Sequence, residues 1–217
     1  MAAQNENALS ERQLAALEKA FRQGAADASD ALARWLGRPS LICVESVEQL
    51  ALHEATRVLG AGDKPVCFCA AEMNGGLTGE LILAFDDASG LALADILLDQ
   101  PLGTANAWGE MEISAALETT NLVSCAYFNS LSRTIVEAGQ GTSELLPSPP
   151  RFSHDFAESL VQFALMGQAV ATDHVVFSRT QFHIDGEPLD WTLLLVPDEE
   201  SMQSLRRWLP TNSKEGP

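Results

Sequence analysis

The chain has 217 residues, of which 46% are apolar and 20% charged, a balance typical of a globular protein with a sizeable core. Its formal net charge of -17 and pI of about 4.4 disfavour nucleic acids and anionic membrane surfaces as partners, because both are themselves negatively charged. The sequence lacks the run of about 18 apolar residues that a membrane-spanning helix needs, and residues 1–10 show no signal-peptide pattern, so we expect a cytoplasmic protein.

The first half of the sequence predicts one long helix, a strand, a β-hairpin and a shorter helix. In the long helix, apolar residues recur at helical spacing, Ser10 and Gln13 form a capping-box pattern, and Gly37 marks the end. In the hairpin, two apolar segments flank an Asn-Gly-Gly turn at residues 74–76. The expected elements are a helix over 9–36, a strand over 41–44, an ambiguous segment over 48–59 read as helix, strands over 66–72 and 78–85, and a helix over 86–98.

The second half predicts a similar order of elements. They are a linker over 100–107, a helix over 108–137, a strand edge and Pro-rich loop over 143–150, a helix over 153–165, strands over 174–184 and 189–196, and a helix over 198–209. Ser153 is expected to cap its helix, because adjacent residues such as Ser153, His154 and Asp155 cannot form a hydrolase triad. Residues 1–8 and 210–217 are expected to be disordered.

The repeated order of elements indicates an internal duplication. Residues 79–87 resemble residues 190–199, and each half begins with a long helix. The sequence therefore predicts one α/β domain of the α+β type over residues 9–209, made of two repeats at about 9–99 and 107–209. In this pseudo-two-fold domain, the strands form a shared antiparallel sheet and the two long helices cover one face.

The cysteine and histidine residues give no metal-binding pattern. The four cysteines lie among apolar or small residues and are expected to be buried free thiols: Cys43, Cys67, Cys69 and Cys125. Cys67 and Cys69 alternate with Phe68, so both thiols should point to one face of a strand. The four histidines are scattered through the sequence, and we therefore expect no metal site.

The strongest functional signal lies in the helix that contains residues 110–124. Glu118 and Asn121 are three residues apart and therefore project from the same face. Asparagine is a poor helix former, so an Asn beside an acid in mid-helix indicates a function. Glu110 and Glu112 point to different faces and are expected only to stabilise the helix N-terminus. The alternative is that Glu118 and Asn121 are ordinary solvent-exposed helix residues.

The sequence around this pair resembles the Glu-x-x-Asn helix of the CheC/CheX/FliY phosphatases, which remove phosphate from chemotaxis response regulators. The matching residues are Ala116-Leu117-Glu118-Thr119-Thr120-Asn121-Leu122-Val123-Ser124. In the same frame, the first helix has Lys19 at the acid position and Arg22 at the amide position, with Gly24 matching a family glycine. The resemblance covers most of residues 12–209, and it implies a CheC-like fold with one intact site per chain.

This resemblance implies a phosphatase that acts on the aspartyl phosphate of a CheY-like receiver domain. Asn121 would orient the attacking water, and Glu118 would pair with the receiver's lysine. Ser114, Leu122 and Cys125 lie near this pair along the helix and are expected to contact the receiver. The implied protein has no cofactor of its own, because Mg²⁺ belongs to the receiver. The implied partner is the phosphorylated receiver, and homodimer formation is left open.

Two other functions remain open because the first helix has lost its pair. One is a non-catalytic binding module that recognises a receiver or another chemotaxis or flagellar signalling partner. The other is a subunit whose main task is dimerisation or the regulation of another enzyme. Since receiver active sites are acidic and so is this chain, docking requires a locally neutral or basic surface, for which Lys19 and Arg22 are candidates.

Overall fold

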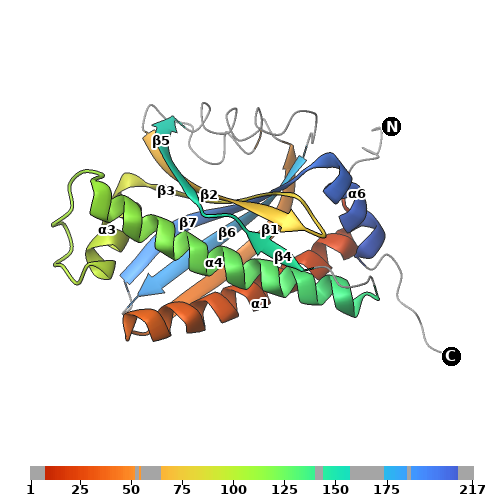
Figure 1. The fold of residues 1–217 in the computed structure, drawn as a ribbon, viewed down its shortest axis with the longest axis horizontal. Helices are drawn as coiled ribbons and strands as arrows, with labels where there is room; N and C mark the ends of the chain where they lie inside the picture. The colour runs from red at the N-terminus through yellow and green to blue at the C-terminus, as the bar shows by residue number, and fades with distance from the viewer. Residues whose placement is uncertain are drawn as a thin grey trace.

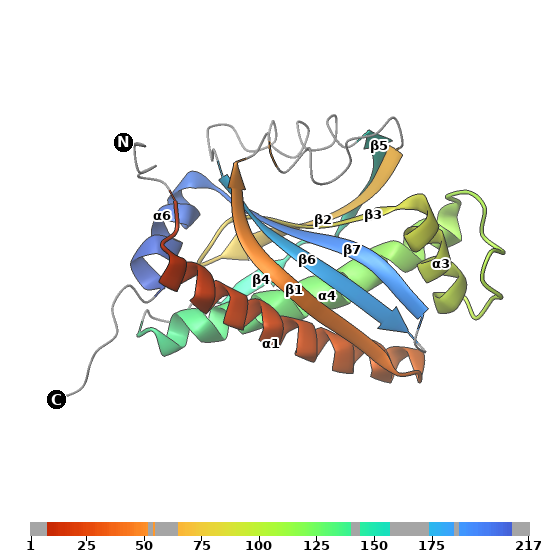
Figure 2. The same cartoon turned by 180° about the vertical axis from the view of Figure 1, so that it is seen from behind.

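The computed structural model describes residues 8–51, 54, 65–139, 144–156, 174–184 and 187–209. In this part of the chain, a seven-stranded antiparallel sheet carries two long helices on one face, as the sequence predicted (Figures 1 and 2). The helices are α1 (Glu11–Leu36), α3 (Asp87–Leu97), α4 (Glu110–Glu137) and α6 (Glu199–Trp208). The strands are β1 (Ser40–Ala51), β2 (Pro65–Gly75), β3 (Gly79–Asp86), β4 (Leu145–Pro147), β5 (Arg151–Phe156), β6 (His174–Ile184) and β7 (Glu187–Pro197).

Helix α1 begins and ends where local signals predict. The Ser10 hydroxyl accepts a hydrogen bond from the Gln13 backbone N–H, and the Gln13 side chain accepts one from the Ser10 backbone N–H at 2.9 Å. At the other end, Gly37 adopts a φ of 64°, the left-handed conformation that ends many helices. These caps satisfy backbone groups that the helix itself leaves unpaired.

Helix α4 packs on the sheet through a face made mostly of small residues. The buried hydroxyls of Thr119 and Thr120 donate to the carbonyl oxygens of Ala115 and Ala116, at 3.0 and 2.8 Å. These bonds satisfy polar groups that would otherwise be costly to bury. The small side chains also allow α4 to lie close to its neighbours.

Helices α1 and α4 cross on the same face of the sheet (Figures 1 and 2). Gly24 lies at the crossing, where an added Cβ would lie only 3.0 Å from the Cα of Tyr127. The Ser130 hydroxyl donates to the carbonyl oxygen of Ala20 at 2.7 Å. The rings of Phe21 and Tyr127 meet edge to face, with centroids 5.3 Å apart. Small residues therefore allow α1 and α4 to pack closely, and one buried hydrogen bond links them.

The strand order is β1-β6-β7-β3-β2, and both β4 and β5 pair with β2. Strands from the two halves of the chain are interleaved, because the second-half pair β6–β7 lies between β1 and β3 of the first half. Exchanging β1 with β4 and β5, β2 with β6, and β3 with β7 returns the same order in reverse. The sheet is thus symmetric under exchange of the two halves.

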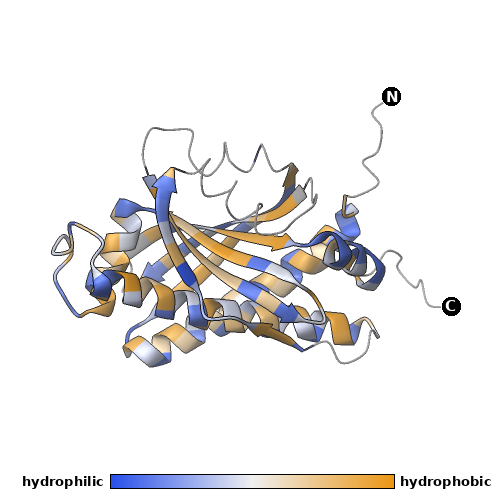
Figure 3. Ribbon diagram, turned by 45° about the horizontal axis from the view of Figure 1, so that its top comes forward, coloured by the Kyte–Doolittle hydropathy of each residue, from blue (hydrophilic) through white to orange (hydrophobic). Residues whose placement is uncertain are grey.

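The sheet is apolar on both faces, and Figure 3 shows apolar residues gathered along its strands. Cys67 and Cys69 lie in the core on the face covered by the helices, whereas Phe68 lies on the opposite face, as their alternation predicted. All four cysteines are free, although Cys43 and Cys125 are only half-buried. None of the helices described is long and apolar enough to cross a membrane.

Two segments that the sequence assigned to helices contain strand where the structure describes them. Residues 48–51 belong to β1, which pairs with β6 as far as Ala51. Residues 153–156 belong to β5, which pairs with β2, so Ser153 caps no helix. In both segments, pairing with a distant strand overrides the local pattern. Glu54 is the one further described residue of the 48–59 segment, and it is helical. The remaining residues of both segments, and the predicted disorder of residues 1–7 and 210–217, lie outside the described residues, whereas Ala8, also expected to be disordered, is described.

Strand β3 contains a buried carboxylate that depends on a single close ion pair. The Glu80 side chain is 9% exposed, and one of its carboxylate oxygens lies 2.6 Å from a guanidinium nitrogen of Arg151 on β5. Burial raises the pKa of Glu80, and Arg151 opposes this rise. The ion pair with Arg151 therefore lowers the free-energy cost of keeping the buried Glu80 carboxylate ionised.

Replacing Arg151 with alanine is expected to destabilise the protein by about 1–3 kcal/mol at neutral pH, because a buried charge loses its partner. Glu80 has a folded-state pKa above its unfolded value, so its destabilising effect should fade as the pH falls and the native carboxyl becomes protonated. Urea unfolding at pH values of about 7.5 and about 5.5 measures this change. The matched control is Arg151→Ala combined with Glu80→Gln, which should show little pH dependence. An equal loss at both pH values in Arg151→Ala would contradict the assignment.

Candidate functional site

The five residues that the sequence places in the site lie along one stripe of α4. They are Ser114, Glu118, Asn121, Leu122 and Cys125. Successive residues are three or four positions apart except Leu122, which directly follows Asn121, and the helix brings all five to the same side. Ser114 and Glu118 are exposed, and the other three are half-buried. The stripe therefore presents polar groups to solvent beside the half-buried side chains of Leu122 and Cys125.

The two polar groups at the centre of the stripe have no partner in the described part of the chain. The Glu118 carboxylate forms no ion pair there, and the Asn121 amide forms no hydrogen bond. Asn121 is held through its backbone, whose carbonyl oxygen accepts a hydrogen bond from the Ser124 hydroxyl at 3.1 Å. An amide with an open donor and acceptor can bind a water molecule or a partner's polar group. An open carboxylate can pair with a cation.

Cys125 lies one turn beyond Asn121. Burial raises the pKa of its thiol, and the negative charge of Glu118 raises it further. The thiol is therefore protonated at neutral pH and is not activated as a nucleophile. The stripe supplies positioned hydrogen-bonding and charged groups rather than a nucleophile and base.

Helix α1 carries a stripe that corresponds to the one on α4. When Lys19 of α1 is aligned with Glu118 of α4, and Arg22 with Asn121, eight buried residues of α1 fall opposite eight buried residues of α4. In α1 these are Leu17, Ala20, Phe21, Gly24, Ala25, Ala28, Ser29 and Leu32, and in α4 they are Ala116, Thr119, Thr120, Val123, Ser124, Tyr127, Phe128 and Leu131. Lys19 and Arg22 therefore stand where α4 presents its acid and amide.

The two basic residues of the α1 stripe are not equivalent. The Arg22 guanidinium donates to the Glu18 carboxylate at 2.6 Å and to the carbonyl oxygen of Val44 at 2.7 Å. Val44 belongs to the edge strand β1, whereas α4 packs against β2 and β4 at the other end of the sheet. Arg22 is thus bound away from α4, while Lys19 is exposed and has no partner within the described residues. Of the two expected docking cations, Lys19 is the available one.

A second group of reactive side chains lies where β2, β5 and α3 meet. Three donors surround one oxygen of Asp87: Trp108 Nε1 at 2.8 Å, His154 Nε2 at 2.9 Å and Cys67 Sγ at 3.5 Å. The sequence did not reveal this group, because a helix starting at Ser153 would not pair His154 with β2. The alternation of Phe152, His154 and Phe156 with polar residues was the available signal for a strand.

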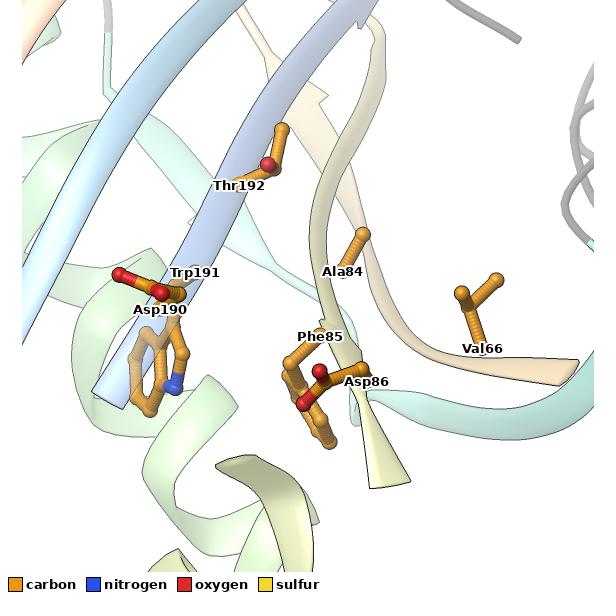
Figure 4. A pocket seen from close by; sticks show the side chains of 7 residues that line it. All are labelled: Val66, Ala84, Phe85, Asp86, Asp190, Trp191 and Thr192. Atoms are coloured by element: carbon orange, nitrogen blue, oxygen red, sulfur yellow. The ribbon is translucent and has the colours of Figure 1, made fainter. Parts of the chain in front are cut away.

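A small hollow of about 190 Å³ opens where β3 and β7 separate (Figure 4). The two strands pair as far as Ala84 and Thr192, and beyond this pair the side chains of Phe85 and Trp191 lie side by side, with ring centroids 6.1 Å apart. Trp191 Nε1 is buried without a hydrogen-bond partner among the described residues. None of the α4 stripe residues lines this hollow, so it is separate from the site that the sequence predicted.

Solved structures with the same architecture identify the fold. Thermotoga maritima FliY has a TM-score of 0.73 at 18% identity, over 93% of this chain and 97% of that chain. The chain has the CheC/CheX/FliY fold. The FliM middle domain from H. pylori matches 92% of this chain and 99% of that chain, with a TM-score of 0.65 at 16% identity. No family model and no curated protein matches the sequence.

The CheC/CheX/FliY fold also occurs in a protein complex. The FliG–FliM complex from H. pylori contains a chain that matches 90% of this chain and 100% of that chain, with a TM-score of 0.62 at 16% identity. At such identities the similarity establishes the fold, which the sequence predicted from its Glu-x-x-Asn helix and repeated elements. The chemistry of the site must be argued from its own residues.

Proposed function

We propose that this protein is a phosphatase for the aspartyl phosphate of a CheY-like response-regulator receiver. Asn121 orients the attacking water, and Glu118 pairs with the receiver's lysine. The observation that carries this proposal is the Glu118–Asn121 pair, which lies one helical turn apart in a CheC/CheX/FliY fold: Glu118 is exposed, Asn121 is half-buried, and neither side chain has a partner in the described part of the chain.

The reaction needs positioning more than acid–base chemistry. In the hydrolysis, the water oxygen attacks phosphorus and the bond from phosphorus to the aspartyl oxygen breaks, which leaves a carboxylate and inorganic phosphate. An acyl phosphate is already reactive, so the main catalytic task is to hold the water in line with the breaking bond. The Asn121 amide can accept one hydrogen bond from this water and donate one to it. The protonated Cys125 thiol is consistent with a mechanism that uses no protein nucleophile.

The remaining residues of the α4 stripe suit contact with another protein. Ser114 is small and exposed, and Leu122 and Cys125 are half-buried, so a receiver can approach the helix backbone closely. Glu118 provides a charge that pairs with a lysine on the partner, and such a pair gains strength when docking excludes water. Mg²⁺ on the receiver supplies the positive charge at the phosphoryl group, and this step needs no metal on the phosphatase.

We also propose that the chain consists of two repeats, at about residues 9–99 and 107–209. The reversible strand order and the matching burial of α1 and α4 support this division. Lys19 and Arg22 then occupy the acid and amide positions of the first repeat. The proposed enzyme therefore has one catalytic site per chain.

A second candidate function is a non-catalytic module that binds a chemotaxis or flagellar partner. A chain of the FliG–FliM complex from H. pylori has the same fold. The replacement of the first pair by Lys19 and Arg22 is also compatible with a protein that binds without hydrolysis. The two candidates differ in whether the bound partner loses phosphate faster.

Phosphate loss and complex formation must therefore be measured separately. We expect purified protein to accelerate the decay of a cognate phosphorylated receiver and to bind the same receiver carrying beryllofluoride, a stable phosphate analogue. Binding without acceleration, across the cognate receivers, would replace the phosphatase by the binding module. The absence of both would exclude a receiver as the partner.

A further inference from the structure

Three side chains with metal-binding atoms converge on the face of the sheet that the helices cover. Cys67 on β2 lies directly opposite His154 on β5, and antiparallel partners of this kind have Cβ atoms about 5 Å apart. Asp87 is the first residue of α3, which begins directly after β3, and it reaches the same place. The sulfur, ring nitrogen and carboxylate oxygen all lie within 4.8 Å of one another.

The distances are close to those of a metal centre. Asp87 Oδ1 lies 2.9 Å from His154 Nε2 and 3.5 Å from Cys67 Sγ. Around a tetrahedral zinc ion, bonds of about 2.0 Å to nitrogen and oxygen and about 2.3 Å to sulfur place neighbouring donors about 3.3–3.6 Å apart. The third separation, between Cys67 Sγ and His154 Nε2, is within 4.8 Å, so side-chain shifts of roughly 1 Å would bring the three donors around one ion.

Hydrogen bonding alone does not satisfy this cluster. The indole N–H of Trp108, the imidazole nitrogen of His154 and the thiol of Cys67 all approach the same oxygen of Asp87. A carboxylate oxygen has about two acceptor sites, fewer than the three donors around it. One cation bound by the sulfur, the nitrogen and the carboxylate removes this excess, because it takes the place of two of the protons.

Trp108 provides the support that metal ligands usually have. Its Nε1 donates to Asp87 at 2.8 Å, and its ring lies against the His154 ring, with centroids 6.3 Å apart. The other side of this arrangement is closed by Phe152, whose ring centroid lies 4.9 Å from that of Trp108. Hydrogen bonds from residues outside the coordination sphere orient ligands in this way in metalloproteins.

We propose that Cys67, Asp87 and His154 bind a divalent metal ion, and that zinc is the ion that suits this mixture of sulfur, oxygen and nitrogen donors. Binding forms a sulfur–metal bond and a nitrogen–metal bond, releases the thiol proton of Cys67 to solvent, and leaves His154 with its one remaining ring proton on Nδ1. A thiolate and a carboxylate then balance the two charges of the ion, and the imidazole is neutral. The Asp87 and His154 side chains are 43% and 30% exposed, so water can fill the fourth position.

The ion would fasten β5 to β2 and to the start of α3. Trp108 lies two residues before α4, so the same cluster also fixes the approach to the helix that carries Glu118 and Asn121. The role is structural, and it stands whether or not the protein is a phosphatase. We therefore expect the bound metal to raise the melting temperature of the protein without affecting any catalytic activity.

The test is a titration of Zn²⁺ or Co²⁺ into metal-free, full-length protein. We expect one equivalent to bind, a thiolate-to-cobalt charge-transfer absorption to develop, and the melting temperature to rise with Zn²⁺. Cys67→Ser should abolish this absorption. His154→Gln should lower zinc affinity by more than the roughly 10- to 100-fold typical of outer ligand-orienting residues, and Trp108→Phe should lower it about 10-fold.

Matched controls separate the cluster from other thiols and imidazoles. Cys69→Ser changes the next thiol on the same face of β2, and His183→Gln changes a half-buried histidine on β6, so both should bind as the wild type does. His154→Gln keeps the proposal testable if Cys67→Ser does not fold, because His154 is partly exposed. No charge-transfer absorption in the wild type, or unchanged zinc affinity in His154→Gln, would show that the cluster is only a hydrogen-bond network.

Discussion

Replacing Asn121 with alanine is expected to slow receiver dephosphorylation about 100-fold while the complex still forms, because the variant loses the group that aligns the water but keeps the docking charge of Glu118. The amide is free to take this role, since it has no side-chain partner in the described part of the chain. The measurement is the rate of phosphate loss at saturating protein, together with the dissociation constant for a beryllofluoride-bound receiver.

The matched control for this variant is Asn129→Ala. Asn129 is an exposed asparagine on the same helix, two turns beyond Asn121, and its loss should leave both the rate and the affinity unchanged. Glu118→Gln should give the complementary result, a weaker complex, because the side chain keeps its shape but loses the charge that pairs with lysine. A wild-type rate in Asn121→Ala would remove Asn121 from the mechanism.

Replacing Gly24 with valine is expected to lower the free energy of unfolding by about 3 kcal/mol, since it overpacks the α1–α4 crossing. Even the first added carbon would lie 3.0 Å from both the Cα and the Cγ of Tyr127, and a backbone atom cannot rotate away. Urea unfolding followed by circular dichroism measures the loss as a shift in the midpoint.

Ala26→Val is the control for the crossing. Ala26 is exposed on α1, so the same β-branched side chain there should cost no more than the difference in helix propensity, about 0.7 kcal/mol. Valine has a better helix propensity than glycine, so propensity alone would make Gly24→Val slightly stabilising. A loss no larger than that of Ala26→Val would show that the close contact at Gly24 is not a constraint.

The elements that the sequence predicted well are those whose ends are decided locally. Ser10 and Gln13 cap α1, Asp86 caps α3 through a bond to the Ser89 N–H at 2.8 Å, and Asp198 caps α6 through a bond to the Ser201 N–H at 2.7 Å. Each cap involves residues three apart, so its pattern is visible without knowledge of the fold. The α4 stripe was predictable for the same reason, because one helix fixes the spacing of Glu118 and Asn121.

The elements that the sequence predicted poorly are strands whose partners are distant. The second half of β1 is a strand because β6 pairs with it, and β5 is a strand because β2 does. The cluster of Cys67, Asp87 and His154 depends on this second pairing, which makes neighbours of three residues that are far apart along the chain. No local sequence pattern predicts which residues of β2 and β5 lie opposite each other.

The interleaving of strands from the two halves has a consequence for how the chain reaches its native state. Four pairings in the described sheet, β1 with β6, β3 with β7, β2 with β4 and β2 with β5, join residues from different halves. Neither half can complete a sheet alone, and β1 has no neighbour until β6 has been synthesised. Contacts so distant in sequence slow folding, so we expect a slow, cooperative transition, and a cut in the 100–107 linker before folding should yield two aggregation-prone fragments.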